Sequence, residues 1–214
     1  MSTESIERNK NTFEESDIVF VSDLFTDEYI GGAELTTEAL FKTSSKKAYK
    51  LKSTELNESH ISSGMQKVWV FFNFAQLNPN AIPHIVAQLN YFIVEYDYKF
   101  CKYRSVELHK ASEGKDCDCH TQASGKFISA FFAGAEKVFW MANAQKERYQ
   151  NVFPFISDER SVLLSSVFDI DDLEYIDRLR SARNQNEIEK EYVVLDSNSW
   201  IKGTSQTKEY LDKQ

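Results

Sequence analysis

Short apolar runs alternate along this chain with longer segments in which apolar residues recur at helical spacing. The clearest runs, rich in β-branched and aromatic residues, lie at residues 18–21, 68–74 and 91–94. Runs that are apolar on both sides of the pleat are typical of strands buried on both faces of a sheet. Strands of this kind that alternate with helices indicate a parallel sheet. The sequence therefore predicts an α/β fold, a Rossmann-like doubly wound sheet that is mainly parallel and has helices on both faces.

The remaining elements follow from the same two patterns. Further strands are predicted at residues 48–52, 137–141, 161–164 and 192–195. One helix is predicted to begin at Ala33, and a second, short helix is predicted after a cap at residues 54–57 and ends at about Ser63. Further helices are predicted at 83–89, 125–135, 144–151 and 169–183, and after Gly203. Residues 99–124 carry no core pattern, so we expect them to form the least regular part of the chain. Doubly wound sheets bind ligands beyond the carboxyl ends of their strands, which directs attention to the segment after each strand.

Composition divides the chain into three parts. Residues 1–16 are polar and charged and contain no hydrophobic signal-peptide core, so we expect a flexible, poorly ordered tail. Residues 17–184 hold most of the apolar runs and form the main domain, with 99–124 as an insert. Residues 185–214 begin with a polar, linker-like stretch and end in one predicted strand and one predicted helix.

The charge balance excludes some classes of partner. The formal charge is 25 − 33 = −8, from 25 Lys and Arg against 33 Asp and Glu. This acidic balance argues against non-specific binding to nucleic acid or to an anionic membrane. No apolar run approaches the roughly 18 residues of a transmembrane helix. Without a secretion signal we expect a cytoplasmic protein, and this setting favours thiols or metal ligands over disulfides for the three Cys residues.

A glycine pair follows the first predicted strand. Gly31 and Gly32 stand between that strand and a helix that starts at Ala33. Backbone N–H groups and the helix dipole attract anions to a helix N-terminus, and a missing Cβ lets a phosphate approach the backbone. We therefore predict a phosphate-binding loop here. The alternative is that the two glycines only turn the chain.

Two carboxylates follow the strand predicted at 91–94. At its carboxyl end, Glu95 and Asp97 would orient sugar hydroxyls, or one of them would act as a base if its pKa were raised. Lys102 and Arg104 are near enough in the sequence to pair with them. We therefore treat both carboxylates as catalytic candidates, against the alternative of an ordinary exposed strand exit.

All three Cys residues lie in the insert. The candidate metal ligands are Cys101, Cys117, Cys119 and His120, with His109 as an alternative fourth ligand. Three thiols and an imidazole match the Cys3His type of structural zinc site, and a metal would replace the hydrophobic stabilisation that this segment lacks. The Cys-x-Cys spacing is tight for a tetrahedral ion. A disulfide from Cys101 to Cys117 or Cys119 and a set of free thiols are the two alternatives.

Four stretches occur in an order that is characteristic of one family. They are Gly31-Gly32-Ala33-Glu34, the strand and helix at 137–149, the strand and loop at 161–169, and residues 193–203 with Lys202-Gly203 at their end. In this order they resemble the N-terminal, acceptor-side domain of retaining glycosyltransferases with the GT-B architecture, in the family 4-like group. The resemblance implies two Rossmann-like domains, of which residues 185–214 would be the linker and the start of the second.

The resemblance assigns roles to several residues. Gly31 and Gly32 would face the diphosphate of a nucleotide-sugar donor, the co-substrate, and Lys202 would bring a positive charge to the same group. The acceptor would be a carbohydrate or glycan, and transfer would retain the anomeric configuration. Catalysis would consist mainly of positioning and of stabilising the charge on the leaving diphosphate.

The sequence departs from the family at three places. Asp196 or Ser197 stands where the family has an Arg, and Glu95 and Asp97 occupy the region in which the family has a His. The family's pair of Glu residues in the second domain has no counterpart, because the chain ends one helix into that domain. These departures imply that a separate chain supplies the donor-binding domain, or that the protein is truncated and inactive alone. The alternatives are a non-catalytic interaction or regulatory domain that retains the fold, and a nucleotide-sugar epimerase.

Overall fold

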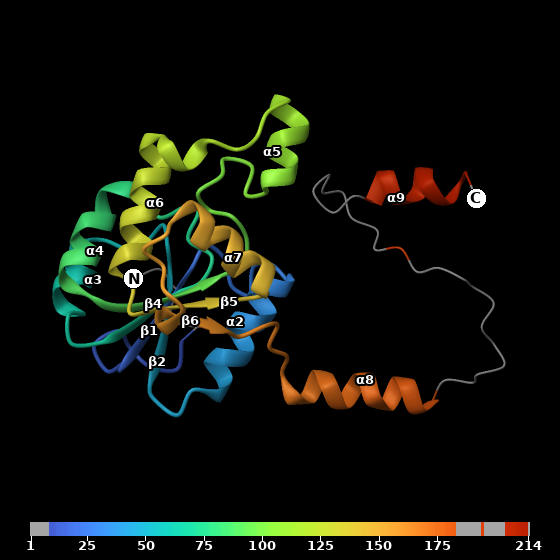
Figure 1. The fold of residues 1–214 in the computed structure, drawn as a ribbon. Coiled ribbons are helices and arrows are strands. Elements are labelled where there is room, and N and C mark those ends of the chain that lie inside the picture. The colour runs from blue at the N-terminus through green and yellow to red at the C-terminus, as the bar shows by residue number, and fades with distance from the viewer. Residues whose placement is uncertain (1–8, 183–193, 195–203, 214) are drawn as a thin grey trace. The chain divides into compact units, whose positions relative to one another are not determined.

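A computed structural model describes residues 9–182, 194 and 204–213 of the chain (Figure 1). The chain divides into two compact units, Met1–Ile170 and Asp171–Gln214. The first unit contains all the strands found among the described residues. The second unit begins within a helix that the sequence analysis assigned to the main domain.

The first unit is built on one six-stranded sheet in which every pair of neighbouring strands is parallel (Figure 1). Its strands are β1 (Ile18–Ser22), β2 (Ala48–Lys52), β3 (Val68–Phe71), β4 (Asn90–Glu95), β5 (Lys137–Trp140) and β6 (Ser161–Leu163). In space their order is β2-β1-β3-β4-β5-β6. The order changes direction at β1, so the crevice between β1 and β3 is a switch point of the kind at which open α/β sheets bind ligands. The prediction of a Rossmann-like parallel sheet is confirmed.

Helices lie on both faces of this sheet, as the doubly wound prediction requires. Those of the first unit are α2 (Gly32–Thr43), α3 (Glu58–Ser63), α4 (Ile82–Gln88), α5 (Val106–Glu113), α6 (Ala123–Gly134) and α7 (Asn143–Val152). Helices α3, α4, α6 and α7 bury side chains in the larger core on one face, whereas α2 packs on the other face. Right-handed crossovers explain this division, because the connection through α2 crosses the sheet in the direction opposite to the others.

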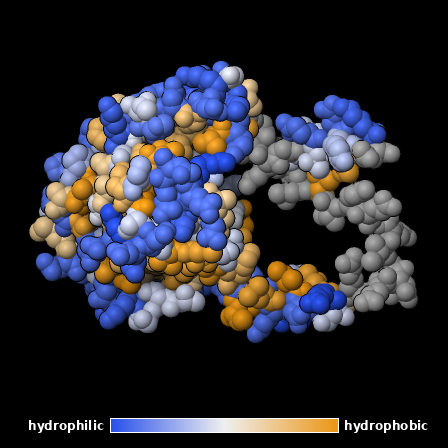
Figure 2. All heavy atoms as spheres, in the orientation of Figure 1, coloured by the Kyte–Doolittle hydropathy of each residue, from blue (hydrophilic) through white to orange (hydrophobic). Residues whose placement is uncertain are grey.

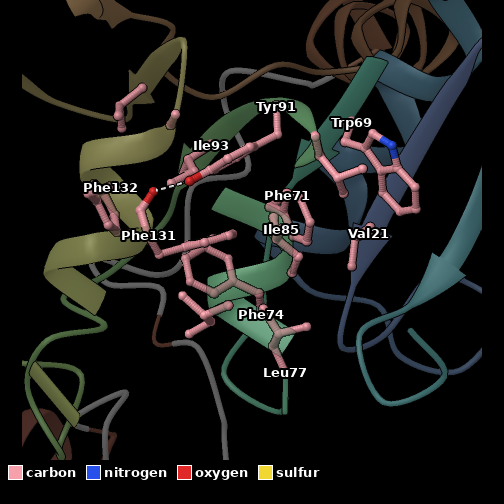
Figure 3. Packing of buried hydrophobic residues seen from close by; sticks show 14 of the residues in the cluster. Val21, Trp69, Phe71, Phe74, Leu77, Ile85, Tyr91, Ile93, Phe131 and Phe132 are labelled. Atoms are coloured by element: carbon pink, nitrogen blue, oxygen red, sulfur yellow. Dashed lines mark hydrogen bonds between the residues drawn. The ribbon is translucent and has the colours of Figure 1, made fainter. Parts of the chain in front are cut away.

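The larger core is rich in aromatic side chains. Alternate residues of β3 and β4, such as Phe71 and Tyr91, point into it and meet Phe131 of α6 (Figure 3). The rings of Tyr91 and Phe131 stack with centroids 4.9 Å apart, and the Tyr91 hydroxyl donates a 2.5 Å hydrogen bond to the Phe131 carbonyl. Each aromatic pair of this kind adds about 0.5–1.5 kcal/mol beyond the area that it buries. The aromatic residues of the predicted strands thus form the centre of the fold.

The opposite face of the sheet carries a smaller core. Phe20, Phe72 and Val94 are buried there, and Leu40 and Phe41 of α2 pack against them. The same face also holds an open apolar pocket of about 320 Å³, lined by residues from β1, β3, β4, β5 and α2. In the first unit, this face is therefore covered less completely than the other.

Part of the N-terminal stretch packs against the sheet, which differs from the expected poorly ordered tail. The side-chain amide of Asn9 bonds to both backbone groups of Lys50 in β2, accepting from its N–H at 2.6 Å and donating to its carbonyl at 3.0 Å. Phe13 is buried and contacts the rings of Tyr49 and Trp69. A single aromatic residue in a polar stretch has no periodicity, so the sequence pattern could not reveal this contact.

The insert that was expected to be irregular contains α5. Ser105 caps the N-terminus of this helix by accepting a hydrogen bond from the Leu108 N–H, and Gly114 ends it in the left-handed conformation at φ 69°. Ser and Gly at these places are ordinary cap signals. The helix escaped prediction because it is short and buries only His109, so its sequence has no apolar stripe.

The described part of the second unit is helical. It consists of α8 (Ile170–Ala182), which starts at the last residue of the first unit, and α9 (Thr204–Leu211). Apolar side chains gather on α8, where Leu173 and Ile176 are exposed (Figure 2). Apart from Val194, the strand predicted at 192–195 lies outside the described residues.

Candidate functional site

The loops that follow β1 and β3 meet at the carboxyl edge of the sheet. Asp23, directly after β1, is buried and accepts hydrogen bonds from the Ser53 hydroxyl and from two backbone N–H groups of the loop after β3. Its own N–H donates to the carbonyl of Asn73 at 2.6 Å. Asp23 therefore ties together the two loops that border the β1–β3 crevice.

A chain of charged side chains continues along this edge from β4. The Nζ of Lys99 lies 3.3 Å from Glu95 Oε1 and 3.2 Å from Asp97 Oδ1. The guanidinium of Arg104 holds the other oxygen of Asp97, with Nε 2.6 Å from Oδ2, and also donates to Asn73 Oδ1 at 2.6 Å. The Glu95 and Lys99 side chains are almost fully buried, whereas those of Asp97 and Arg104 are partly exposed. The chain thus runs from a buried end at Glu95 to a solvent-facing end at Arg104.

Burial and neighbouring cations shift the pKa values of the two candidate carboxylates in opposite directions. Burial raises the pKa of Glu95 to about 8, against the opposing effect of Lys99. Burial also acts to raise the pKa of Asp97, but Lys99 and Arg104 together bring that pKa below its ordinary value. Neighbouring carboxyl groups whose pKa values are pushed apart often divide into a proton-holding acid and a permanent anion. Because Glu95 is fully buried, contact with a ligand from solvent falls to Asp97.

Helix α7 braces the same chain. The side-chain amide of Gln145 donates to the backbone carbonyls of Glu95 and Asp97, at 3.1 and 3.2 Å. The hydroxyl of Tyr149 accepts a 3.0 Å hydrogen bond from the Lys99 N–H. The backbone after β4 is therefore held in place by hydrogen bonds that leave its charged side chains free to pair with one another.

Arg104 has a strained backbone. Its φ of 55° lies in the left-handed region, which residues other than glycine seldom adopt. Its N–H donates to the Cys101 carbonyl and its carbonyl accepts from the Tyr98 N–H, so residues 98–104 form a closed loop. Strain of this kind costs about 1–3 kcal/mol and clusters at functional sites. The fold thus sustains an unfavourable conformation that holds the guanidinium beside Asp97.

A pocket of about 270 Å³ opens beside this closed loop. Its walls come from the loop after β3, from the closed loop and from the start of α6. They are mostly apolar and include Phe74 and Phe127, while Lys102 and Arg104 add positive charge. Apolar walls with a few charged groups are the usual form of a small-molecule site.

The glycine pair lies at the start of α2, as predicted. Gly31 is the extended N-cap residue, and its helix start has no side-chain cap. A Cβ on Gly31 would come 2.6 Å from a carboxylate oxygen of Glu34 and 2.7 Å from the Tyr29 ring. A Cβ on Gly32 would meet no atom within 4 Å, so the backbone there borders open space. Lys202, the third residue predicted for this anion site, lies outside the described residues.

A second cluster of reactive side chains lies in the insert. One potential ligand atom from each of four residues falls within 4.8 Å of the others, in Cys101, His109, Cys117 and Cys119. The Nδ1 of His109 is 3.7 Å from Cys101 Sγ and 3.5 Å from Cys119 Sγ. The three Cys residues are free, so the structure does not contain the disulfide considered as an alternative. The cluster is of the kind that can hold a metal ion.

His109 takes the place that the sequence analysis gave first to His120. His120 follows Cys119 in a short 3-10 turn, Cys119–Thr121, and its ring contacts that of Phe153, with centroids 6.5 Å apart. Successive side chains of a 3-10 turn point about 120° apart, so neighbours in the sequence diverge in space. His109 instead reaches the sulfur atoms from α5.

Sequence reasoning missed four residues that shape the edge site, namely Asn73, Lys99, Gln145 and Tyr149. Lys99 follows a predicted strand, Asn73 lies near the end of the run at 68–74, and the other two lie in the helix after a strand, so their position at the carboxyl edge was a usable signal. Their partners depend on how the loops fold back, which a sequence pattern does not contain.

Comparisons with known proteins do not assign this chain to a family. No family model matches the chain, and a search of the curated proteins gives no significant match. None of the described helices is long and apolar enough to span a membrane. The fold and the geometry define an α/β protein with a Rossmann-like parallel sheet, a charged site at the carboxyl edge and a Cys and His cluster beside it.

Proposed function

We propose that the first unit is the acceptor-side domain of a glycosyltransferase, which takes part in moving a sugar from a nucleotide-sugar donor to a carbohydrate acceptor. The observation that carries this proposal is the open, glycine-led start of α2, which follows β1 on the edge that also bears the charged chain. The order of the four family-like stretches supports the same proposal. A donor-binding domain, in this chain or in a separate one, would complete the site.

In this proposal the N-terminus of α2 receives the donor diphosphate. No side chain caps its first N–H groups, and the helix dipole adds partial positive charge there. Gly32 leaves room for phosphate oxygens to reach the backbone. The same N–H groups would stabilise the negative charge that develops on the diphosphate as the sugar departs.

Asp97 and Arg104 are the groups that would orient the acceptor. Both side chains reach solvent, and the lowered pKa of Asp97 keeps its carboxylate ionised and ready to accept hydrogen bonds from sugar hydroxyls. Lys99 and Arg104 each hold one oxygen of Asp97, which fixes the direction of the carboxylate. Most of the catalytic effect in such an arrangement comes from positioning.

The proposal includes one small-molecule co-substrate and one metal ion. The nucleotide sugar is a co-substrate that the α2 N-terminus binds through its diphosphate. A structural zinc ion is the metal that the chemistry of three thiolates and one imidazole favours at the Cys and His cluster.

The test changes the charge at Gly32 and leaves the fold intact. Gly32→Asp places a carboxylate at the start of α2, where it stabilises the helix by about 0.3–1 kcal/mol but repels a diphosphate. Gly32→Asn has nearly the same shape without the charge and is the matched control. We expect isothermal titration to show binding of a nucleoside diphosphate or nucleotide sugar to the wild-type chain. We expect the Asp variant to bind about tenfold or more weakly than the Asn variant, with no loss of thermal stability.

Three results would count against this proposal. If nothing from a panel of nucleoside diphosphates and nucleotide sugars binds the wild-type chain, the enzyme assignment fails and the non-catalytic domain with the same fold is favoured. Equal affinities of the Asp and Asn variants would show that the diphosphate does not bind at α2. Isomerisation of the sugar on its nucleotide, without transfer, would support the epimerase alternative.

A further inference from the structure

We propose that the buried Cys and His cluster is a structural zinc site that also holds the closed loop of residues 98–104 in place. Its four ligands are Cys101, His109, Cys117 and Cys119. They come from three separate pieces of chain, which are the closed loop, α5 and the segment before α6. An ion bound by all four would join these pieces to one another.

The distances in the cluster fit a tetrahedral zinc ion. Bonds of about 2.3 Å to sulfur and about 2.0 Å to nitrogen at tetrahedral angles place ligand S and N atoms about 3.6 Å apart. The Nδ1 of His109 lies 3.7 Å from Cys101 Sγ and 3.5 Å from Cys119 Sγ. All four ligand atoms lie within 4.8 Å of one another, a spread suited to a single ion. The site is thus already close to the geometry that a bound ion requires.

The cluster is largely shielded from solvent and offers four protein ligands, as structural zinc sites do. Cys101, His109 and Cys119 are each no more than 2 % exposed, and Cys117 is half-buried. Structural zinc sites use four protein ligands, whereas catalytic zinc sites keep one position for water or substrate. Three thiolates together with an imidazole also favour zinc over hard cations such as magnesium or calcium. The cluster therefore points to a structural role.

His109 is difficult to explain without a metal. It is the only buried residue of α5, and Val106 is the partly buried apolar side chain of this helix that packs against the larger core. Within the described residues, the Nδ1 of its ring has two sulfur atoms as polar contacts, whereas its Nε2 is buried without a hydrogen-bond partner. A metal bound at Nδ1 would share this nitrogen with the two sulfur atoms that already surround it. Coordination would also supply the free energy that packs α5 onto the domain.

The ion would act on the edge site through Cys101. The N–H of Cys101 donates to the Tyr98 carbonyl and its carbonyl accepts from the Arg104 N–H, both at 2.8 Å. Two tight turns therefore meet at Cys101, and fixing its sulfur fixes both of them. Arg104, with its left-handed backbone, is the residue that the second turn delivers to Asp97. The zinc site thus extends the proposed function, because it positions a residue of the proposed acceptor site.

The first experiment measures metal content in the full chain and three variants. The protein is purified with a reducing agent and without chelator from zinc-supplemented cells, and its metals are determined by mass spectrometry. We expect about one zinc ion per chain in the wild type and in His120→Ala, the matched control. We expect its loss in His109→Ala and in Cys117→Ser, of which Cys117 is the less buried ligand. Cobalt added to the zinc-free wild type should give the visible and near-ultraviolet bands of tetrahedral thiolate coordination, so the site is testable even where a variant fails to fold.

Several outcomes would overturn the metal site. These are a wild-type chain that carries no zinc and binds no cobalt, a His120→Ala variant that loses the metal while His109→Ala keeps it, and a native mass that shows a disulfide. None of these readouts depends on sugar transfer, so failure of the proposed function would leave them intact.

The second experiment tests whether the bound ion keeps the closed loop of residues 98–104 in place. Hydrogen exchange is compared between the zinc-bound chain and the chain after chelation. We expect the backbone amides of residues 98–104 to exchange faster after zinc is removed, while amides of β1 and β3 keep their protection. Unchanged exchange in the loop would show that the ion does not position Arg104.

Discussion

Glu95 combines complete burial with a cation as its nearest charged neighbour. Lys99 lies 3.3 Å from one of its oxygens, but the loss of water raises the pKa of Glu95 to about 8. The ordinary value for this group is 4.5. The folded chain therefore keeps a proton on Glu95 over a pH range in which the unfolded chain releases it.

This difference predicts a pH dependence of stability that one substitution removes. The contribution of Glu95 is fully present below the unfolded pKa of 4.5 and is lost as the pH rises through about 8, since only the folded state holds the proton in between. In urea unfolding, the wild type should lose more free energy of unfolding between about pH 5 and pH 8 than Glu95→Gln does. Glu136→Gln, at an exposed position, is the control and should behave like the wild type. Identical pH slopes in all three proteins would contradict the prediction.

The candidate residues show which parts of a site can be predicted from sequence. Glu95 and Asp97 were found because the end of a buried strand is a fixed place in a parallel sheet. Lys99 was missed because its partners are set by a turn that brings it back to the strand. The choice between His109 and His120 depends on the direction of each side chain: closeness in sequence to Cys119 favoured His120, whereas the structure brings His109 within reach of the three thiols.

At the scale of elements, α6 starts against the turn that carries Cys119. Gly125, in the first turn of α6, lies so close to this turn that a Cβ would collide with the Cys119 carbonyl oxygen and come 2.5 Å from the His120 Cα. Both obstacles are backbone atoms, which cannot move aside as a flexible side chain would. Gly125 is therefore required for the close contact between α6 and the turn that carries Cys119.

Gly125→Ala should destabilise the protein by about 1–3 kcal/mol, because the added methyl group forces the helix away from the turn. Gly32→Ala is the control, since its methyl group meets no atom within 4 Å. That change should be neutral or should stabilise α2 by up to about 1 kcal/mol. Urea unfolding of both variants gives the comparison. Equal stabilities would mean that α6 and the turn are not in close contact.

The elements also differ in how readily the sequence reveals them. β1, β3 and β4 were predicted because both faces of the sheet bury apolar side chains, which produces continuous apolar runs. β3 ends at Phe71, earlier than its apolar run, because Phe74 turns back into the larger core from a loop. For α5, Ser105 and Gly114 were present as caps, but a helix without an apolar face gives no periodic signal.

On the scale of the whole first unit, the N-terminal stretch belongs to the folded structure. Phe13 is 3 % exposed and lies among the rings of Tyr49, His60 and Trp69. Lys67 adds a cation 5.2 Å from the centroid of the Phe13 ring. These contacts join residues before β1 to β2, α3 and β3.

Phe13→Ala should therefore cost about 3–5 kcal/mol of stability, the usual loss when a buried aromatic side chain is removed. Phe155→Ala is the matched control, because Phe155 is 40 % exposed and its removal leaves a smaller cavity. Thermal or urea unfolding of the two variants would separate the two cases. A loss below that of the control would indicate that the stretch around Phe13 is detached in solution.

The Asn9 side chain has a consequence for how the protein behaves at high concentration. β2 is the outermost strand of the sheet, and the N–H and C=O of Lys50 are the groups through which a strand from another molecule would pair with it. Asn9 occupies both of them. The Asn11 side chain does the same for the carbonyl of Ala48. These two asparagine side chains thus block the pairing of β2 with a strand of another molecule. A chain that lacks them would present an unpaired sheet edge to its neighbours.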